Sequence, residues 1–263
     1  MDLNIAERVA IVGASSKGLG RACAVALARE GARVVICARH IEPLQRAAAD
    51  IGATTGREVL PVVADLTQKA DIEHLVSETQ NRWGAPDILV NNIGGPPPGG
   101  FLDHGEEAFQ QAFERLLLYP LRIMKLTIPA MQQQRWGRIV NMTSMAVKEP
   151  VADLVLSGVF RTGLISMCKA LAHELAAQNV LINNVAPGAF ETDRALELLR
   201  ERSERTGRTV ADLRAEGVKT LPMGRYLQPE ELANVVAFLC SEHASAVTGT
   251  TIPIDGGGMY SLF

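Results

Sequence analysis

The sequence has little of what marks several large classes of protein. Only four cysteines occur in 263 residues, and aromatic residues make up 5% of the chain. Cys23, Cys37, Cys168 and Cys240 are scattered among apolar neighbours, so buried thiols are expected rather than disulfides or metal ligands. None of the five histidines stands in a metal-binding motif, and no metal is predicted.

Charge and hydropathy exclude further classes. A formal net charge of −3 provides no basic surface for nucleic acid. No window approaches the roughly 18 uninterrupted apolar residues that a membrane span needs, and the start at Met1 to Asn4 does not resemble a signal peptide. We therefore expect a cytoplasmic protein with no nucleic-acid or membrane partner.

Apolar runs of strand length alternate with amphipathic helical segments, which is typical of βα units and a parallel sheet. The predicted strands are Val9–Val12, Val34–Cys37, Leu60–Val63, Ile88–Asn91, Arg138–Met142, Leu181–Val185 and Thr251–Ile254. With 47% hydrophobic residues, the chain can bury one large core. The prediction is a single α/β domain over residues 1–263, a doubly wound Rossmann fold with about seven parallel strands and helices on both faces.

The segment after Phe160 carries the clearest helical pattern. Apolar residues recur there at steps of three and four and form one face: Leu164, Met167, Cys168, Leu171 and Leu175. We expect this face in the core or in a subunit interface. Pro96 to Gly100 form a stiff turn expected at the carboxyl edge of the sheet, where ligands bind.

The first strand runs into a loop of small residues that suits a pyrophosphate. Gly13, Ser15, Ser16, Lys17, Gly18, Leu19 and Gly20 lie in this loop, and an Ala-rich helical stretch follows. Such a loop lets backbone N–H groups and a helix N-terminus approach a phosphate, although a simple tight strand–helix turn would look the same.

The second strand ends at Ala38-Arg39-His40, without the acid that would accept a hydrogen bond from a ribose 2′-hydroxyl. Arg39 and Lys17 suit a 2′-phosphate instead, so NADP(H) is predicted over NAD(H). The alternative is that both are solvated surface cations.

Several motifs together resemble one family. They are the loop from Gly13 to Gly20, Ala64-Asp65-Leu66-Thr67, Asn91-Asn92-Ile93-Gly94, Arg138 to Ser144, Asn184 to Gly188, and Ile254 to Gly257. The chain resembles the short-chain dehydrogenase/reductase family over essentially its whole length, and β-ketoacyl-carrier-protein reductases in particular. The resemblance implies that Asp65, with Leu66 beside it, contacts adenine. It also implies that Asn91 and Gly94 line the ribose side and that Pro187, Gly188 and Thr192 flank the nicotinamide.

The sequence departs from that family at the loop and at the catalytic positions. Gly13-Ala14 replaces the usual Thr-Gly, so we expect binding to survive with the loop shifted or the affinity reduced. Ser144 matches the catalytic serine, but Ser157 replaces the tyrosine and Arg161 replaces the lysine. The asparagine position falls at Leu116, which we expect to make the pocket floor more apolar.

Such a site predicts slow carbonyl reduction, in which Ser144 and Arg161 polarise the carbonyl and water or Ser157 lies in the proton path. Alternatively, Ser157 caps a helix, Arg161 is solvated, and the chain is an inactive NADP(H)-binding sensor or scaffold. Tyr119, Tyr226 and Tyr260 do not lie four residues before a lysine, although one of them could reach the pocket from elsewhere in the fold or from a neighbouring subunit.

Residues 191–218 are rich in mixed charge, and in similar proteins this segment is a mobile helical lid. Its arginines could contact an anionic acyl carrier, so the predicted substrate is a small 3-oxoacyl-like carbonyl or an acyl-carrier thioester. The alternative is a solvated helix with internal ion pairs. The resemblance also implies a homo-oligomer, a tetramer or dimer, assembled through the helices around 105–130 and 158–177 and the C-terminal strand. The apolar Leu116-Leu117-Leu118 run fits such a contact or a monomer core.

Overall fold

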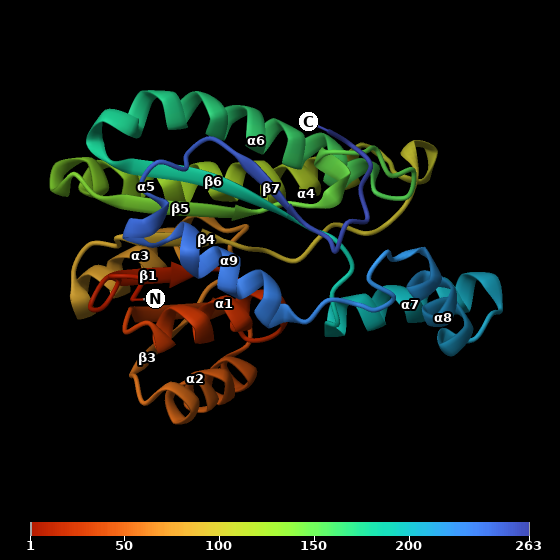
Figure 1. Cartoon of the computed structure of the whole chain (residues 1–263), viewed down its shortest axis with the longest axis horizontal. Coiled ribbons are helices and arrows are strands. Elements are labelled where there is room, and N and C mark those ends of the chain that lie inside the picture. The colour runs from red at the N-terminus through yellow and green to blue at the C-terminus, as the bar shows by residue number, and fades with distance from the viewer. Residues whose placement is uncertain (1, 263) are drawn as a thin grey trace.

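The computed structural model describes residues 2–262, which form a single sheet of parallel strands covered by helices on both faces (Figure 1). The seven strands are β1 (Val9–Val12), β2 (Arg33–Ala38), β3 (Val59–Val63), β4 (Ile88–Asn91), β5 (Gly137–Met142), β6 (Val180–Pro187) and β7 (Thr251–Ile254), in the order β3-β2-β1-β4-β5-β6-β7. Every predicted strand is confirmed. β1, β2, β4, β5 and β6 are mostly apolar and buried, as expected of strands covered on both faces.

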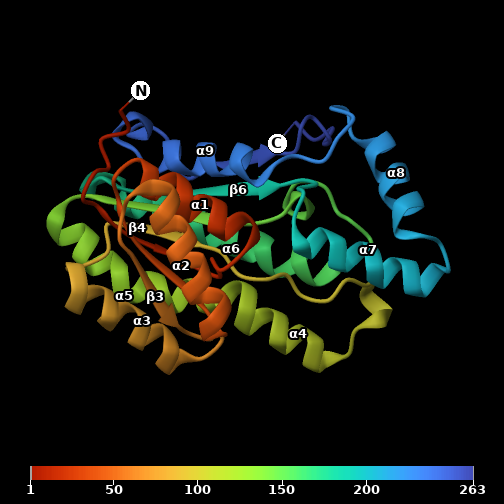
Figure 2. The same cartoon turned by 90° about the horizontal axis from the view of Figure 1, so that it is seen from below.

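The helices connect the strands. They are α1 (Gly18–Arg29), α2 (Ile41–Thr55), α3 (Lys69–Trp83), α4 (Glu106–Phe113), α5 (Tyr119–Gln134), α6 (Val155–Leu175), α7 (Asp193–Thr206), α8 (Val210–Thr220) and α9 (Pro229–Leu239). A π-helical turn over Glu114–Leu118 joins α4 to α5. One core contains buried residues of α1, α2 and α9, and the other contains those of α3, α5 and α6 (Figure 2).

The helix predicted after Phe160 is α6, and its apolar face lies on the sheet. Leu164, Cys168 and Leu175 are buried in the second core, with Met167 and Leu171 partly buried beside them. By length and composition alone, Val155–Gln178 could also cross a membrane, although it carries Arg161 and Lys169. It is a layer helix of the sheet, and 33% of its most apolar window is buried, so much of its outer surface is left uncovered.

The strand order reverses direction beside β1, which pairs with β2 on one side and β4 on the other. At such a switch point the connections leave in opposite directions and open a crevice at the carboxyl ends of the strands. α7 and α8 form a pair of helices that projects beyond this edge (Figure 1). They correspond to the segment predicted as a helical lid.

Candidate cofactor and substrate site

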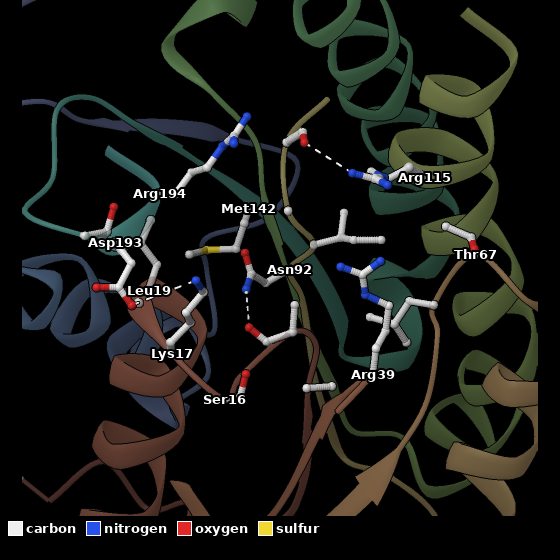
Figure 3. A pocket seen from close by; sticks show the side chains of 18 of the residues that line it. Ser16, Lys17, Leu19, Arg39, Thr67, Asn92, Arg115, Met142, Asp193 and Arg194 are labelled. Atoms are coloured by element: carbon white, nitrogen blue, oxygen red, sulfur yellow. Dashed lines mark hydrogen bonds and ion pairs between the residues drawn. The ribbon is translucent and has the colours of Figure 1, made fainter. Parts of the chain in front are cut away.

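The crevice at the switch point is a cleft of about 580 Å³, a size typical of ligand sites. It is lined from the loop after β1, the ends of β2 to β5, and the start of α7 (Figure 3). Among the lining residues are these predicted site residues: Ser16, Lys17, Gly18, Leu19, Arg39, Asp65, Leu66, Gly94, Ser144, Arg161, Pro187 and Thr192. The topology therefore brings most of the predicted set into one place.

The loop after β1 leaves a helix N-terminus open to the cleft. α1 begins at Gly18, its N-cap Lys17 makes no side-chain cap, and its first turn holds no acid. The first N–H groups of a helix lack partners within the helix, and the helix dipole favours an anion there. Gly18 has φ +60°, and a Cβ at Gly20 would come within 2.6 Å of the Ala14 carbonyl oxygen. These features fit a pyrophosphate on the backbone of the loop.

Ala14 has φ +43°, in the left-handed region that favours glycine. This is the position where the family usually has a glycine. Asn92 Nδ2 donates to the carbonyl oxygens of Gly13 and Ala14 at 3.0 and 3.2 Å, which ties the loop to the end of β4. The alanine is therefore accommodated at some conformational cost, with its side chain at the cleft wall.

Several residues predicted to bind the cofactor do not line the cleft. These are Gly13, Ser15, Gly20, Asn91 and Gly188. The fully buried Ser15 Oγ donates to Val12 O at 2.7 Å and accepts the Cys37 N–H at 3.1 Å, so its side chain joins β1 to β2. Asn91 Nδ2 donates to Asn141 Oδ1 at 2.8 Å, inside the sheet. The side chains of Ser15 and Asn91 hold strands together.

The glycines of this set allow close approach of backbones. A Cβ at Gly13 would lie 2.4 Å from Asn92 O and 2.5 Å from the Tyr119 hydroxyl. A Cβ at Gly188 would lie 2.8 Å from Asp255 Cα. Both glycines therefore shape the loops that border the cleft.

Cations dominate the charge of the cleft. Its lining includes Lys17, Arg39, Arg115, Arg161 and Arg194, against the acids Asp65 and Asp193. Burial tends to raise the pKa of Asp65, but hydrogen bonds from Thr67 and the charges of Arg39 and Arg115 lower it overall. Asp65 is therefore ionised, and its Oδ1 accepts from Thr67 N and Oγ1 at 2.9 and 2.8 Å.

Lys17 and Arg39 both line the cleft but differ in their partners. The Lys17 Nζ lies 3.1 Å from Glu197 Oε1 and 3.9 Å from Asp193 Oδ2, both in α7. Arg39 forms no ion pair or hydrogen bond among residues 2–262, and its side chain extends into the cleft (Figure 3). Of the two cations predicted to bind the 2′-phosphate, Arg39 is therefore the one whose charge is not paired within residues 2–262.

Ser144 and Arg161 both line the cleft, and both are placed beside the end of β5. Ser144 follows that strand, and its Oγ accepts the Ala146 N–H at 3.2 Å while the hydroxyl proton stays available. Arg161 lines the cleft from α6 and donates through Nη1 to the Met142 carbonyl oxygen. Its buried Nε has no partner among the described residues. Burial lowers the pKa of Arg161 to about 10, so the guanidinium is charged at neutral pH.

This geometry contradicts the alternative that Ser157 is an N-cap and Arg161 a solvated residue. α6 begins at Val155 with Leu154 as its N-cap, so Ser157 lies inside the first turn. Arg161 is only 7% exposed. Ser157 is also buried, one turn before Arg161, and does not line the cleft.

The structure also bears on the predicted place of Leu116 and on whether a tyrosine reaches the cleft. Leu116 is 1% exposed and does not line the cleft, so it does not form the pocket floor as predicted. None of the three tyrosines within residues 2–262 lines the cleft either. Tyr119 is buried near Gly13, the Tyr226 ring lies 4.9 Å from the Arg214 guanidinium, and Tyr260 is 94% exposed.

Sequence reasoning missed Arg115 and Arg194, which line the cleft from the π-turn and from α7. Arg115 Nη1 donates to Gly95 O at 3.3 Å, and Arg194 Nη2 donates to Pro96 O at 3.4 Å. Arg194 was noted only as one of many charges in its segment. No motif marked Arg115.

The segment predicted as a lid carries many ion pairs. Arg194 lies 3.6 and 3.7 Å from Glu197 and Glu201, and Arg214 pairs with Glu191 at 2.5 Å. Arg208 pairs with Glu216 at 2.6 Å. This supports the solvated-helix alternative for these arginines, whereas Arg200 and Arg202 form no ion pair in the described part of the chain.

Comparison with known proteins identifies the class. The fold and the cleft define a dinucleotide-binding α/β protein, and the family model for enoyl-(acyl carrier protein) reductase matches residues 13–259. The chain is 34% identical to the 3-oxoacyl-[acyl-carrier-protein] reductase FabG of Aquifex aeolicus, over 98% of this chain and 99% of that protein. It is 35% identical to the dehydrogenase/reductase SDR family member 4 of Oryctolagus cuniculus, over 96% of this chain and 94% of that protein. The chain belongs to the short-chain dehydrogenase/reductase family.

Solved structures agree with this assignment. L-Sorbose reductase of Gluconobacter frateurii, in complex with NADPH and L-sorbose, matches with a TM-score of 0.94 at 30% identity and covers 100% of both chains. Actinorhodin polyketide ketoreductase with NADPH matches with a TM-score of 0.92 at 32% identity, over 97% of this chain and 98% of that chain. The predicted doubly wound fold is thereby confirmed.

Proposed function

We propose that the protein is an NADPH-dependent reductase of a small carbonyl substrate, with a site that works without the usual tyrosine and lysine. The observation that carries the proposal is that Ser144, which follows β5, and Arg161, which donates to the last residue of β5, both line the cleft. The uncapped N-terminus of α1 and the open Arg39 fit a phosphorylated dinucleotide in the same cleft. NADPH, when bound, supplies a hydride to the carbonyl carbon.

Within this proposal Ser144 and Arg161 act on the carbonyl oxygen. The Ser144 hydroxyl donates a hydrogen bond to it, and the Arg161 guanidinium places a fixed positive charge where negative charge develops. The hydrogen bond from Arg161 to the Met142 carbonyl holds that guanidinium in place, so it needs little rearrangement during the reaction. A preorganised donor of this kind is worth roughly 10²–10³ in kcat.

Water supplies the proton in this scheme. Arg161 keeps its proton at neutral pH, and Ser157 lies outside the lining of the cleft. An aliphatic hydroxyl is a much weaker acid than a tyrosine, whose ordinary pKa is about 10. Ser157 would join the proton path only through an intervening water.

The test compares three variants in NADPH oxidation with β-ketoacyl thioesters, diketones and aldehydes. Arg161→Met should lower kcat by roughly 10²–10³ while NADPH binding, followed by nicotinamide fluorescence, persists. Ser157→Tyr combined with Arg161→Lys should raise kcat by at least about tenfold, because a positioned general acid contributes roughly 10²–10⁴. Arg82→Met, far from the cleft in α3, is the control. Unchanged turnover in Arg161→Met would refute the assigned role.

A second candidate is an NADP(H)-binding sensor or scaffold. It is favoured by the absence of all three tyrosines from the cleft lining within residues 2–262. Bound NADPH without turnover across the whole panel, in the wild type and in the double variant, would support this candidate over the reductase.

We propose a 3-oxoacyl-like substrate because the chain is 34% identical to a 3-oxoacyl-[acyl-carrier-protein] reductase over nearly its whole length. The related L-sorbose reductase shows that the same fold also accommodates a sugar. A ketose is therefore added to the panel of thioesters, diketones and aldehydes as a comparison. Residues 191–218 are proposed as the lid, since α7 contributes Asp193 and Arg194 to the cleft.

We further propose a homo-oligomer, a tetramer or dimer, assembled through the helices around 105–130 and 158–177 and through the C-terminal strand β7. Exposed apolar side chains support this: Phe101 and Leu102, in the turn before α4, are 68% and 93% exposed, and Val159 of α6 is 51% exposed. Ring centroids 6.1–6.3 Å apart link Phe101, Phe109, Phe160 and Phe113 across these helices. Light scattering of the purified chain tests this assembly. Four free, buried cysteines support a reducing compartment, so the cytoplasm is proposed.

A further inference from the structure

Arg115 and Arg39 extend toward the same part of the cleft. Arg115 comes from the π-turn after α4 and Arg39 from the end of β2, and both lie on the side of the cleft opposite Lys17 and Asp193 (Figure 3). Asp65 is a carboxylate neighbour of both, and its Oδ1 already accepts two hydrogen bonds from Thr67. Two guanidinium groups therefore face one region with little negative charge between them.

Arg115 is held loosely and carries a charge that the protein does not neutralise. It is half-buried, forms no ion pair within residues 2–262, and makes a single hydrogen bond of 3.3 Å to Gly95 O. Burial and the charge of Arg39 lower its pKa, and Asp65 opposes this only in part. Partly buried like charges repel each other, so an anion bound between them would be favoured.

Lys17, the other candidate cation, has partners on the opposite side. Its ammonium lies 3.1 Å from Glu197 and 3.9 Å from Asp193. Arg194 is similarly paired with Glu197 and Glu201. Within residues 2–262, the cleft arginines without a carboxylate at ion-pair distance are Arg39, Arg115 and Arg161, and Arg161 instead donates to the Met142 carbonyl oxygen.

We propose that Arg115 is a cofactor-binding residue that, together with Arg39, binds the 2′-phosphate of NADP(H). This rests on the NADP(H) binding proposed above. A planar guanidinium can donate two parallel hydrogen bonds to one phosphate, and two guanidiniums can share its oxygens. Selectivity for NADPH over NADH then depends on a residue of the π-turn as well as on the residue after β2.

The test measures binding directly, by nicotinamide fluorescence, with NADPH and with NADH. Arg115→Gln should raise the Kd for NADPH by about tenfold or more and the Kd for NADH by less than about threefold. Arg39→Gln should act in the same way. The double variant should lose less than the product of the two single losses, because both side chains bind one phosphate.

Arg194→Gln is the matched control, since it removes the same charge from the same cleft and also breaks one hydrogen bond to the loop after β4. A similar NADPH-selective loss in that variant would show a general effect of charge and overturn the proposal. Equal losses for NADPH and NADH in Arg115→Gln would also overturn it. So would unchanged Kd values with a raised KM for keto-acid substrates only, because Arg115 would then bind a substrate carboxylate. A wild type that binds neither cofactor would instead refute the proposed function itself.

Discussion

At the amino edge of the sheet, Arg8 and Arg138 stack on the ring of Trp136, whereas at the carboxyl edge Arg39 and Arg115 face an open cleft. The guanidinium carbons of Arg8 and Arg138 lie 3.9 and 4.4 Å from the ring centroid. Arg8 also pairs with Asp87 at 3.0 Å, and Arg138 with Glu242 at 3.5 Å. The Trp136 Nε1–H donates to Glu242 at 2.5 Å.

Arginine therefore has different roles at the two edges of the sheet. At the amino edge, Arg138 is 0% exposed, and its remaining donors contact the carbonyl oxygens of Gly137, Asn179 and Ser241. Removing one partner of a buried, hydrogen-bonded charge pair strongly destabilises the folded protein. At the carboxyl edge the protein leaves guanidiniums without carboxylates, which is the arrangement expected where a ligand brings the anion.

The largest effect on stability should come from removing the buried guanidinium of Arg138 at the amino edge. Arg138→Ala removes a fully buried guanidinium and leaves three carbonyl oxygens, Trp136 and Glu242 without it. We expect the free energy of unfolding to fall by about 3–5 kcal/mol, measured by urea denaturation. NADPH affinity of the folded fraction should be unchanged, because Arg138 and Trp136 lie at the edge of the sheet opposite the cleft.

The control for Arg138 is Arg82→Ala. Arg82 also pairs with a carboxylate, Glu58 at 2.6 Å, and lies 5.8 Å from the Trp83 ring, but its side chain is 50% exposed. Exposed pairs of this kind contribute up to about 1 kcal/mol. If both variants lost the same stability, burial of the amino-edge cluster would not be the cause.

The next effect concerns the phosphate loop at the carboxyl edge. In Gly20→Ala, the added Cβ would meet Ala14 O and Asn92 Nδ2 at 2.6 Å. Overpacking should lower the free energy of unfolding by about 1–3 kcal/mol. Displacement of the loop should weaken NADPH binding by at least about tenfold. Gly105→Ala, where nothing lies within 4 Å of the new Cβ, serves as the control in both measurements.

The pH dependence of turnover tests whether the charge of Arg161, at the carboxyl edge, acts in the reaction. Burial lowers the pKa of Arg161 from its ordinary value to about 10. Below pH 10 the residue is charged in the folded and unfolded chain, so its burial costs stability, and that cost diminishes as pH rises above 10. Turnover should instead fall as pH rises through about 10, because the charge at the carbonyl oxygen is lost.

Arg161→Lys tests this assignment. The ordinary pKa of lysine is about 2 units lower than that of arginine, and burial lowers it as well. The alkaline fall in kcat should therefore move to lower pH in the variant. Circular dichroism over the same pH range distinguishes the fall in kcat from unfolding. An identical pH profile of kcat in the wild type and in Arg161→Lys would exclude Arg161 as the source of the fall.

The positions of the strands were predictable because most of them are apolar runs covered on both faces. Their carboxyl ends then place Arg39, Asp65 and Ser144 at one edge. The direction of the Ser15 side chain was not predictable, since Ser15 lies in the loop after β1. Asn91 is the last residue of β4, and its hydrogen bond to Asn141 of β5 depends on strand pairing that the pattern of one strand does not show. Arg115 was missed because it lies in a π-turn, where the extra residue per turn changes the helical phase that periodicity assumes.

The smallest effect tests Lys17, a cation of the cleft that is paired with carboxylates of α7. Glu197→Gln removes the carboxylate that lies 3.1 Å from Lys17 Nζ and leaves Asp193 at 3.9 Å. The side chains of Lys17 and Glu197 are 59% and 44% exposed, so the pair is worth at most about 1 kcal/mol. A freed Lys17 and one less acid near the cofactor phosphates should tighten NADPH binding by up to about fivefold, measured by fluorescence titration. Glu204→Gln removes an exposed acid of the same helix that forms no ion pair within residues 2–262, and it should change the Kd much less. Weaker NADPH binding in Glu197→Gln would mean that the ion pair holds α7 in the position that the cofactor requires, and that pairing at the carboxyl edge also serves structure.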